Sequence, residues 1–171
     1  MQLRYPPSAF RFPFLAGALA LLTALPACDS GSKNRMPSQP ANIQPSRVGV
    51  WATPPLDTDA NGYVDTVEIT VYVSADQHPV PLSVPGTFTF RLIGRDKKDL
   101  ATWHIDEPAA QAAMRRSRVG PGYFFTLNVK DVATDEIDAQ SAELAAEFTP
   151  RTGKPVQAPL TGLRFGRTRP K

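Results

Sequence analysis

An alternation of apolar and polar residues with a period of two is the feature that most restricts how this chain can fold. It is clear in four segments, at residues 66–73, 87–92, 100–105 and 123–129. Successive side chains of a β-strand point to opposite faces of its sheet, so the alternation predicts strands that are buried on one face. The polar turn at residues 94–99 predicts that the second and third strands form a hairpin.

Two other segments complete the predicted fold. Residues 106–116 begin with Asp106 as a helix cap, carry Pro108 in the first turn and end with arginines, which predicts a short helix. Residues 141–148 have a helix-forming composition, but their context favours a strand. We therefore predict a mainly β fold, an antiparallel immunoglobulin-like β-sandwich with one short helix.

The amino terminus predicts export from the cytoplasm. Residues 14–25 form an unbroken run of apolar and small residues, and Arg4 and Arg11 precede it without any acidic residue. A membrane-spanning helix needs about 20 apolar residues, and this run is shorter. Because a polar stretch follows at once, the pattern is typical of a signal peptide.

The junction Leu25-Pro26-Ala27-Cys28 resembles the lipobox of bacterial lipoproteins, and Cys28 is the only cysteine of the chain. The resemblance implies a diacylglycerol on Cys28, cleavage before it, and a lipid anchor in a membrane of the cell envelope. A secretory signal cleaved beside an incidental thiol is the alternative. Asp29 resembles the inner-membrane retention signal of enterobacterial lipoproteins, but the sequence does not specify which membrane.

Composition divides the rest of the chain. After the leader at residues 1–27, residues 28–47 are rich in Ser, Pro, Asn and Gln, which predicts a disordered tether. The β-sandwich is expected over residues 48–163 and a basic tail over residues 164–171. Residues 48–147 contain eight Lys or Arg against fifteen Asp or Glu, and six basic residues follow with no acidic one. An exported domain with an acidic body is not expected to bind nucleic acid.

Residues 57–68 match the pattern D-x-[DN]-x-[DN]-G-x5-E at every specified position, and they resemble the calcium loop of EF-hand proteins. Gly62 allows the sharp turn of such a loop. By position, the resemblance implies six residues that supply oxygen ligands for Ca²⁺. Five of them use their side chains, and Tyr63 uses its backbone carbonyl. The implied ligands are Asp57, Asp59, Asn61, Tyr63, Asp65 and Glu68.

The flanks of this loop differ from those of an EF-hand. Pro54 and Pro55 oppose an entering helix, and the residues after the loop alternate as in a strand. We therefore interpret the loop as a structural clip, with a dissociation constant on the order of 0.1–1 mM. An ordinary turn rich in Asp, Asn and Gly is the alternative.

A single cysteine and two isolated histidines give no zinc or disulfide pattern. The export signal and the loop are therefore the features from which we predict the function. The chain looks like the small exported β-sandwich lipoproteins of unknown role. We predict a non-enzymatic, calcium-stabilised binding or structural module of the cell envelope. An envelope protein or a glycan is the expected partner, and Phe124, on the outward face of its strand, is the expected contact residue.

Two alternative functions stay open. One is a small envelope enzyme, such as a glycan hydrolase, that uses the acidic residues Asp131, Asp135, Glu136 and Asp138. The same residues are compatible with a second ion site or a solvated loop. The other alternative is a subunit that adds an edge strand to an envelope assembly.

Overall fold

The computed structural model describes residues 36–137 and 141–167. The leader, Cys28 and the first part of the tether lie outside the described residues. In chain order the elements are β1 (Arg47–Ala52), β2 (Thr66–Ser74), β3 (Gly86–Ile93), β4 (Asp99–Ile105), α1 (Glu107–Ala113), β5 (Met114–Ser117), β6 (Gly120–Asn128), the 3₁₀ turn η1 (Val129–Asp131), β7 (Ala142–Pro150), β8 (Val156–Gln157) and β9 (Thr161–Leu163).

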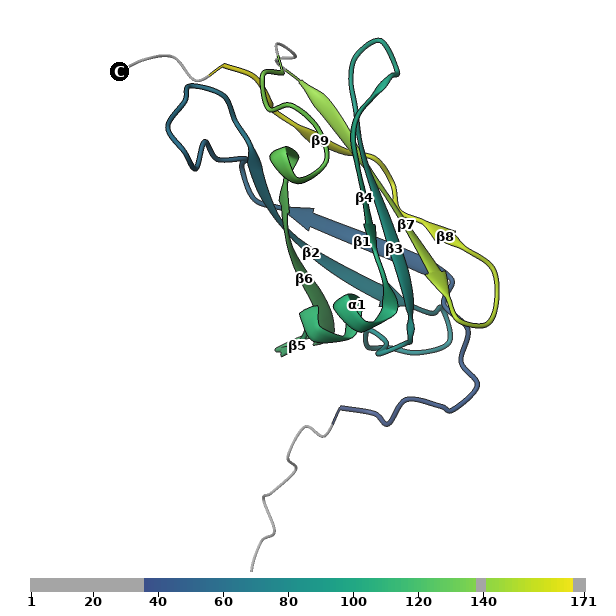
Figure 1. The fold of residues 1–171 in the computed structure, drawn as a ribbon. Helices are drawn as coiled ribbons and strands as arrows, with labels where there is room; N and C mark the ends of the chain where they lie inside the picture. Colours follow the sequence, from purple (N-terminus) through teal and green to yellow (C-terminus); the bar gives the residue numbers. More distant parts are fainter. Residues whose placement is uncertain (1–35, 138–140, 168–171) are drawn as a thin grey trace, which may run out of the picture. The chain divides into compact units, whose positions relative to one another are not determined.

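The strands form two layers (Figure 1). One sheet has the order β1-β2-β6-β5, and the other has the order β4-β3-β7-β8, with β9 also paired to β7. Every pairing between the described strands is antiparallel. The predicted antiparallel β-sandwich is therefore confirmed, with one α-helix among the described residues.

The core lies between the sheets, where the apolar residues of the alternating segments meet. Phe88 is at its centre, because its ring centroid lies 4.8–5.8 Å from the centroids of Phe90, Tyr123, Phe125 and Phe148. These rings come from β3, β6 and β7, so both sheets contribute to one cluster. Offset and edge-to-face arrangements of this kind add to the free energy gained from burial alone.

The helix is shorter than the sequence predicts. Asp106 caps it, since its carboxylate accepts a hydrogen bond from the Ala109 amide at 2.9 Å. It ends at Ala113 instead of reaching Arg116, because Met114 adopts an extended backbone and begins β5. Pairing with β6 satisfies the backbone amides and carbonyls of β5. This tertiary contact outweighs the local helix preference of the segment. From β5, Arg115 still donates to the Ala112 carbonyl at the helix end, at 2.6 Å.

The segment that starts at Ser141 with a helix-forming composition is part of a strand, as its context predicted. It forms most of β7, whose residues alternate between buried and half-exposed positions. On one side β7 pairs with β3 over eight residues. On its other side it pairs with β8 and β9. A central position supplies hydrogen-bond partners along both edges, which offsets the weak strand preference of its alanines.

The two ends of the packed domain extend beyond residues 48–163. Before β1, the Gln39 side chain accepts from the Ser83 amide at 2.8 Å and donates to the Ser83 carbonyl at 3.1 Å. After β9, Phe165 is buried, and the Gly166 carbonyl accepts from the Val64 amide at 3.3 Å. The start of the predicted basic tail is therefore part of the fold, because its phenylalanine packs into the core.

Residues 36–46 enter the sandwich at the end where β2 finishes and β3 begins (Figure 1). The connection from β1 to β2, which contains the predicted calcium loop, lies at the opposite end. In the register of the first sheet, Arg47 pairs with Ser74 at one end and Ala52 pairs with Ile69 toward the other. No helix in the part of the chain that the structure describes is long and apolar enough to cross a membrane.

Candidate metal-binding loop

The loop between β1 and β2 is fixed to the sandwich at its base. The Leu56 amide donates to the Thr66 carbonyl at 2.8 Å, and the Asp65 amide donates to the Leu56 carbonyl at 2.9 Å. The turn itself uses left-handed backbone at Ala60 (φ 58°) and Gly62 (φ 91°). Glycine adopts this conformation at little cost, which is the role that the sequence assigned to Gly62.

Three of the predicted ligands come together in this loop. Asp57, Asp59 and Asp65 each offer a carboxylate oxygen, and these oxygens lie within 4.8 Å of one another. Three carboxylates at this spacing can hold a metal ion. Loop amides also point at them, since the Gly62 amide donates to Asp57 at 2.9 Å.

Asp65 connects the cluster to the core. Its side chain is buried, and it accepts hydrogen bonds from the Thr58 amide at 3.1 Å and the Thr58 hydroxyl at 2.8 Å. Burial by itself raises the pKa of the Asp65 carboxyl, but hydrogen bonds from Thr66 and Thr58 and the charge of Lys130 hold the pKa below its ordinary value. Asp65 therefore stays ionised at neutral pH.

The other predicted ligands lie differently. Glu68 is exposed on β2 opposite Thr126 and does not belong to the aspartate cluster. An EF-hand places its last ligand, the equivalent of Glu68, on the exiting helix. Here β2 begins at Thr66, so Glu68 lies on an extended strand. The Asn61 side-chain oxygen accepts from the Tyr63 amide at 2.8 Å, and Tyr63 forms a backbone bridge with Arg167.

Two residues that the sequence did not connect to this loop complete it. They come from the chain between β6 and β7, where Lys130 lies in η1 and Asp135 follows it. The Lys130 ammonium contacts the Asp59 carboxylate and lies 3.1 Å from that of Asp135. The Asn61 amide group donates to Asp135 at 2.7 Å. The β6–β7 connection therefore closes over the loop.

Lys130 partly neutralises the negative charge of the site. Hydrogen bonds to Asp59 and Asp135 raise the pKa of Lys130. The hydrogen bond from Asn61 and the contact with Lys130 lower the pKa of Asp135. A metal cation at this cluster would therefore compete with the Lys130 ammonium for the Asp59 carboxylate. Of the other acidic residues in this connection, Asp131 and Glu136 are exposed, and Asp138 lies outside the described residues.

A second candidate feature lies on the outer face of the first sheet. Phe124, the predicted contact residue, is 42% exposed there, and Trp51 is 74% exposed. Thr70 pairs with Trp51 on one side and with Phe124 on the other, so the three residues form one row across β1, β2 and β6. Trp51 was not among the predicted contact residues, although its position in the alternation after Val48 and Val50 indicates an outward side chain.

Comparisons with known proteins give no family assignment for this chain. No protein-family model matches it, and no curated protein matches it significantly.

The Asp65→Asn substitution tests the link between loop and core. The side-chain amide of the new asparagine places an N–H donor where the carboxylate of Asp65 accepts from Thr58. We therefore expect the free energy of unfolding to fall by about 1–3 kcal/mol. The depressed pKa of Asp65 stabilises the fold above the carboxyl pKa of the unfolded chain, about 3.9, and this contribution is lost as the pH falls through the folded-state pKa. The variant should therefore lose less stability than the wild type on acidification. Urea unfolding in a chelator, between neutral and acid pH, measures both effects.

The matched control is Asp76→Asn, which removes an exposed ion pair with Arg47. It should change the free energy of unfolding by less than about 1 kcal/mol. Equal effects of the two substitutions would contradict a connecting role for Asp65.

Proposed function

We propose that this chain is an exported bacterial lipoprotein, anchored through lipid on Cys28, whose β-sandwich is a non-enzymatic, calcium-stabilised binding module of the cell envelope. The lipobox at residues 25–28 and the signal-like leader support the anchor. The convergence of Asp57, Asp59 and Asp65 is the observation that carries the calcium site. The loop lies at the end of the sandwich opposite residues 36–46 (Figure 1).

Calcium fits the donor set better than a transition metal does. All three side chains offer hard carboxylate oxygens, and the described part of the loop contains no imidazole or thiol. Ca²⁺ accepts six to eight oxygen ligands in flexible geometry, so backbone carbonyls and water can complete the set that Glu68 does not join. Bound calcium neutralises the aspartates in place of Lys130 and fixes the turn against β2.

Calcium titration tests this site. We expect the full chain to bind Ca²⁺ with a dissociation constant on the order of 0.1–1 mM and its melting temperature to rise with calcium concentration. The double variant Asp57→Asn/Asp59→Asn should lose both effects. Lys130→Gln should bind calcium more tightly, because it removes the competing ammonium. Calorimetry and thermal unfolding measure these changes.

Asp76→Asn is again the control and should bind calcium like the wild type. A chain that shows no heat of binding and no change in melting temperature in excess calcium would rule out the site. Equal calcium affinity of Lys130→Gln and wild type would contradict the competition between the two cations.

The lipid anchor is tested at its modified residue. Expressed in a bacterial host with a labelled fatty acid, the wild-type chain should carry the label and sediment with membranes, because two or more acyl chains hold a protein stably. Cys28→Ala should carry no label and should lose cleavage at that position. The control Ser32→Ala, four residues further on, should behave like the wild type. An unlabelled mature protein with a free thiol would instead indicate the secretory alternative.

The row of Trp51, Thr70 and Phe124 supports a glycan as the partner of the binding face. The negative face of an aromatic ring attracts the weakly positive C–H groups of a sugar ring. The two aromatic residues are separated by two strand spacings, about 10 Å, which is close to the length of a disaccharide. Polar side chains flank them on the same face, with Glu68 and Thr126 paired next along the strands.

Affinity electrophoresis in gels that contain purified envelope polysaccharide measures this function. Trp51→Ala and Phe124→Ala should each reduce the retardation of the chain, and the double variant should migrate as in a gel without glycan. Leu160→Ala is the control, because Leu160 is also exposed (53%) but lies in the β8–β9 connection. Retardation that none of the aromatic substitutions changes would exclude this face as the glycan site.

A further inference from the structure

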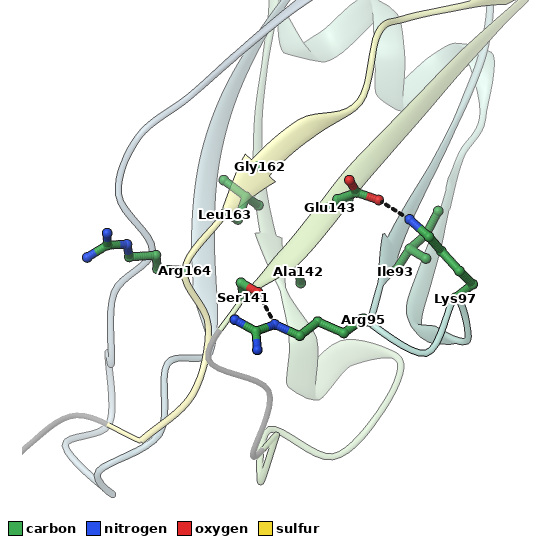
Figure 2. Close-up of a pocket in the computed structure, with 10 residues that line it drawn as sticks. Ile93, Arg95, Lys97, Ser141, Ala142, Glu143, Gly162, Leu163 and Arg164 are labelled. Atoms are coloured by element: carbon green, nitrogen blue, oxygen red, sulfur yellow. Dashed lines mark hydrogen bonds and ion pairs between the residues drawn. The ribbon is translucent and has the colours of Figure 1, made fainter.

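A pocket of about 500 Å³ lies at one end of the second sheet, and its lining shares no residue with the two features described above. It is formed by the β3–β4 turn, the start of β7 and the end of β9 (Figure 2). Apolar and small residues, among them Ile93, Ala142 and Leu163, make up part of its wall. The charged residues that line it are Arg95, Lys97, Glu143 and Arg164. Cations therefore outnumber anions by three to one.

Arg95 lines the pocket and is oriented by one side-chain hydrogen bond. Its Nε group donates to the hydroxyl of Ser141, the residue before β7, at 2.7 Å, and Figure 2 shows the guanidinium beside this serine. Within the described residues, no carboxylate pairs with Arg95. Its two terminal amino groups thus keep their donors, and a planar guanidinium fork matches the oxygens of a phosphate or carboxylate.

Lys97 supplies a second cation on the same turn. It adopts a left-handed backbone (φ 62°), which is uncommon for a residue other than glycine. Its ammonium lies 2.8 Å from the Glu143 carboxylate (Figure 2). The neighbouring acid Asp96 pairs with Lys98 at 3.2 Å and does not line the pocket. Glu143 is therefore the one described acid that competes with an incoming anion here.

Arg164 adds to the positive potential without closing the pocket. It lines the β9 side, and in Figure 2 its guanidinium points away from Arg95. It has no ion-pair partner among the described residues. Among the described residues, these two arginines have no carboxylate partner, so the described wall of the pocket carries an excess of positive charge. Such an excess attracts anions of low molecular weight as well as charged polymers.

We infer that this pocket binds a phosphate group, held by the terminal amino groups of Arg95 and by Lys97 after Lys97 exchanges its contact with Glu143. A phosphate carries enough charge and oxygen acceptors to satisfy both cations, whereas one carboxylate offers only two oxygens. The apolar wall then contacts whatever the phosphate is attached to. This site depends neither on calcium nor on the lipid anchor. Free phosphate compounds and lipid headgroups both offer the required chemistry.

Nuclear magnetic resonance titration of the full chain tests the site with two probes, inorganic phosphate and the soluble short-chain lipid dihexanoyl phosphatidylglycerol. We expect shifts of the Arg95 Nε–H signal and of the Gly94, Ser141 and Gly162 amides. Arg95→Gln should weaken binding roughly tenfold or more, because it removes a charge-assisted bidentate contact. Glu143→Gln should strengthen binding, because it removes the competing carboxylate.

Arg47→Gln is the matched control. Arg47 is also an exposed arginine, but it lies on β1 and pairs with Asp76. It should bind both probes like the wild type. Tighter binding of phosphatidylglycerol identifies a lipid headgroup as the source of the phosphate, and tighter binding of inorganic phosphate identifies a free phosphate. The inference is wrong if neither probe shifts the pocket signals, or if Arg47→Gln weakens binding as much as Arg95→Gln does.

Discussion

Apolar contact between the two sheets is the interaction on which every other part of this structure depends. Neither sheet can bury its apolar face alone, and the cluster around Phe88 joins β3 and β7 of one sheet to β6 of the other. Each large side chain that is buried in this way contributes roughly 1.5–3 kcal/mol. The loops at the two ends of the sandwich keep their positions because this contact fixes the strands from which they start.

Asp65 extends that rigidity into the loop between β1 and β2. It lies one residue before β2, and its carbonyl also accepts from the Val129 amide at 2.7 Å, where η1 begins. A buried carboxylate is costly unless hydrogen bonds satisfy it, and Thr58 supplies two of them. The loop is therefore held in a compact shape by its own polar contacts, and a cation bound at the aspartates would add to an arrangement that already exists.

The charges of this protein are arranged in separate regions. Acidic groups converge at residues 57–65, where Lys130 and Asp135 reach in from the β6–β7 connection. Arginines that have no carboxylate partner among the described residues flank the pocket beside the β3–β4 turn. Both regions lie at the end of the domain opposite residues 36–46 (Figure 1).

The sequence by itself determined the strands, the sandwich and the aspartates of the loop, because these follow from local spacing. Side chains two apart share a face of a strand, and Asp57, Asp59 and Asp65 are close along the chain. Only the tertiary structure decided where α1 ends, because pairing of β5 with β6 competes with the helix preference of Met114 and the arginines. The same holds for Phe165, whose burial requires a core that its own segment cannot supply.

Contacts between distant segments also decided how the candidate sites are completed. Lys130 meets Asp59 across 71 residues, and Asn61 meets Asp135 across 74. No local pattern encodes such pairs, since they exist only once β2 and β6 lie side by side. Glu68 shows the converse. It matches the motif by spacing, but the strand that begins at Thr66 holds it on the exposed face. The spacing of the motif therefore did not determine where the Glu68 side chain lies.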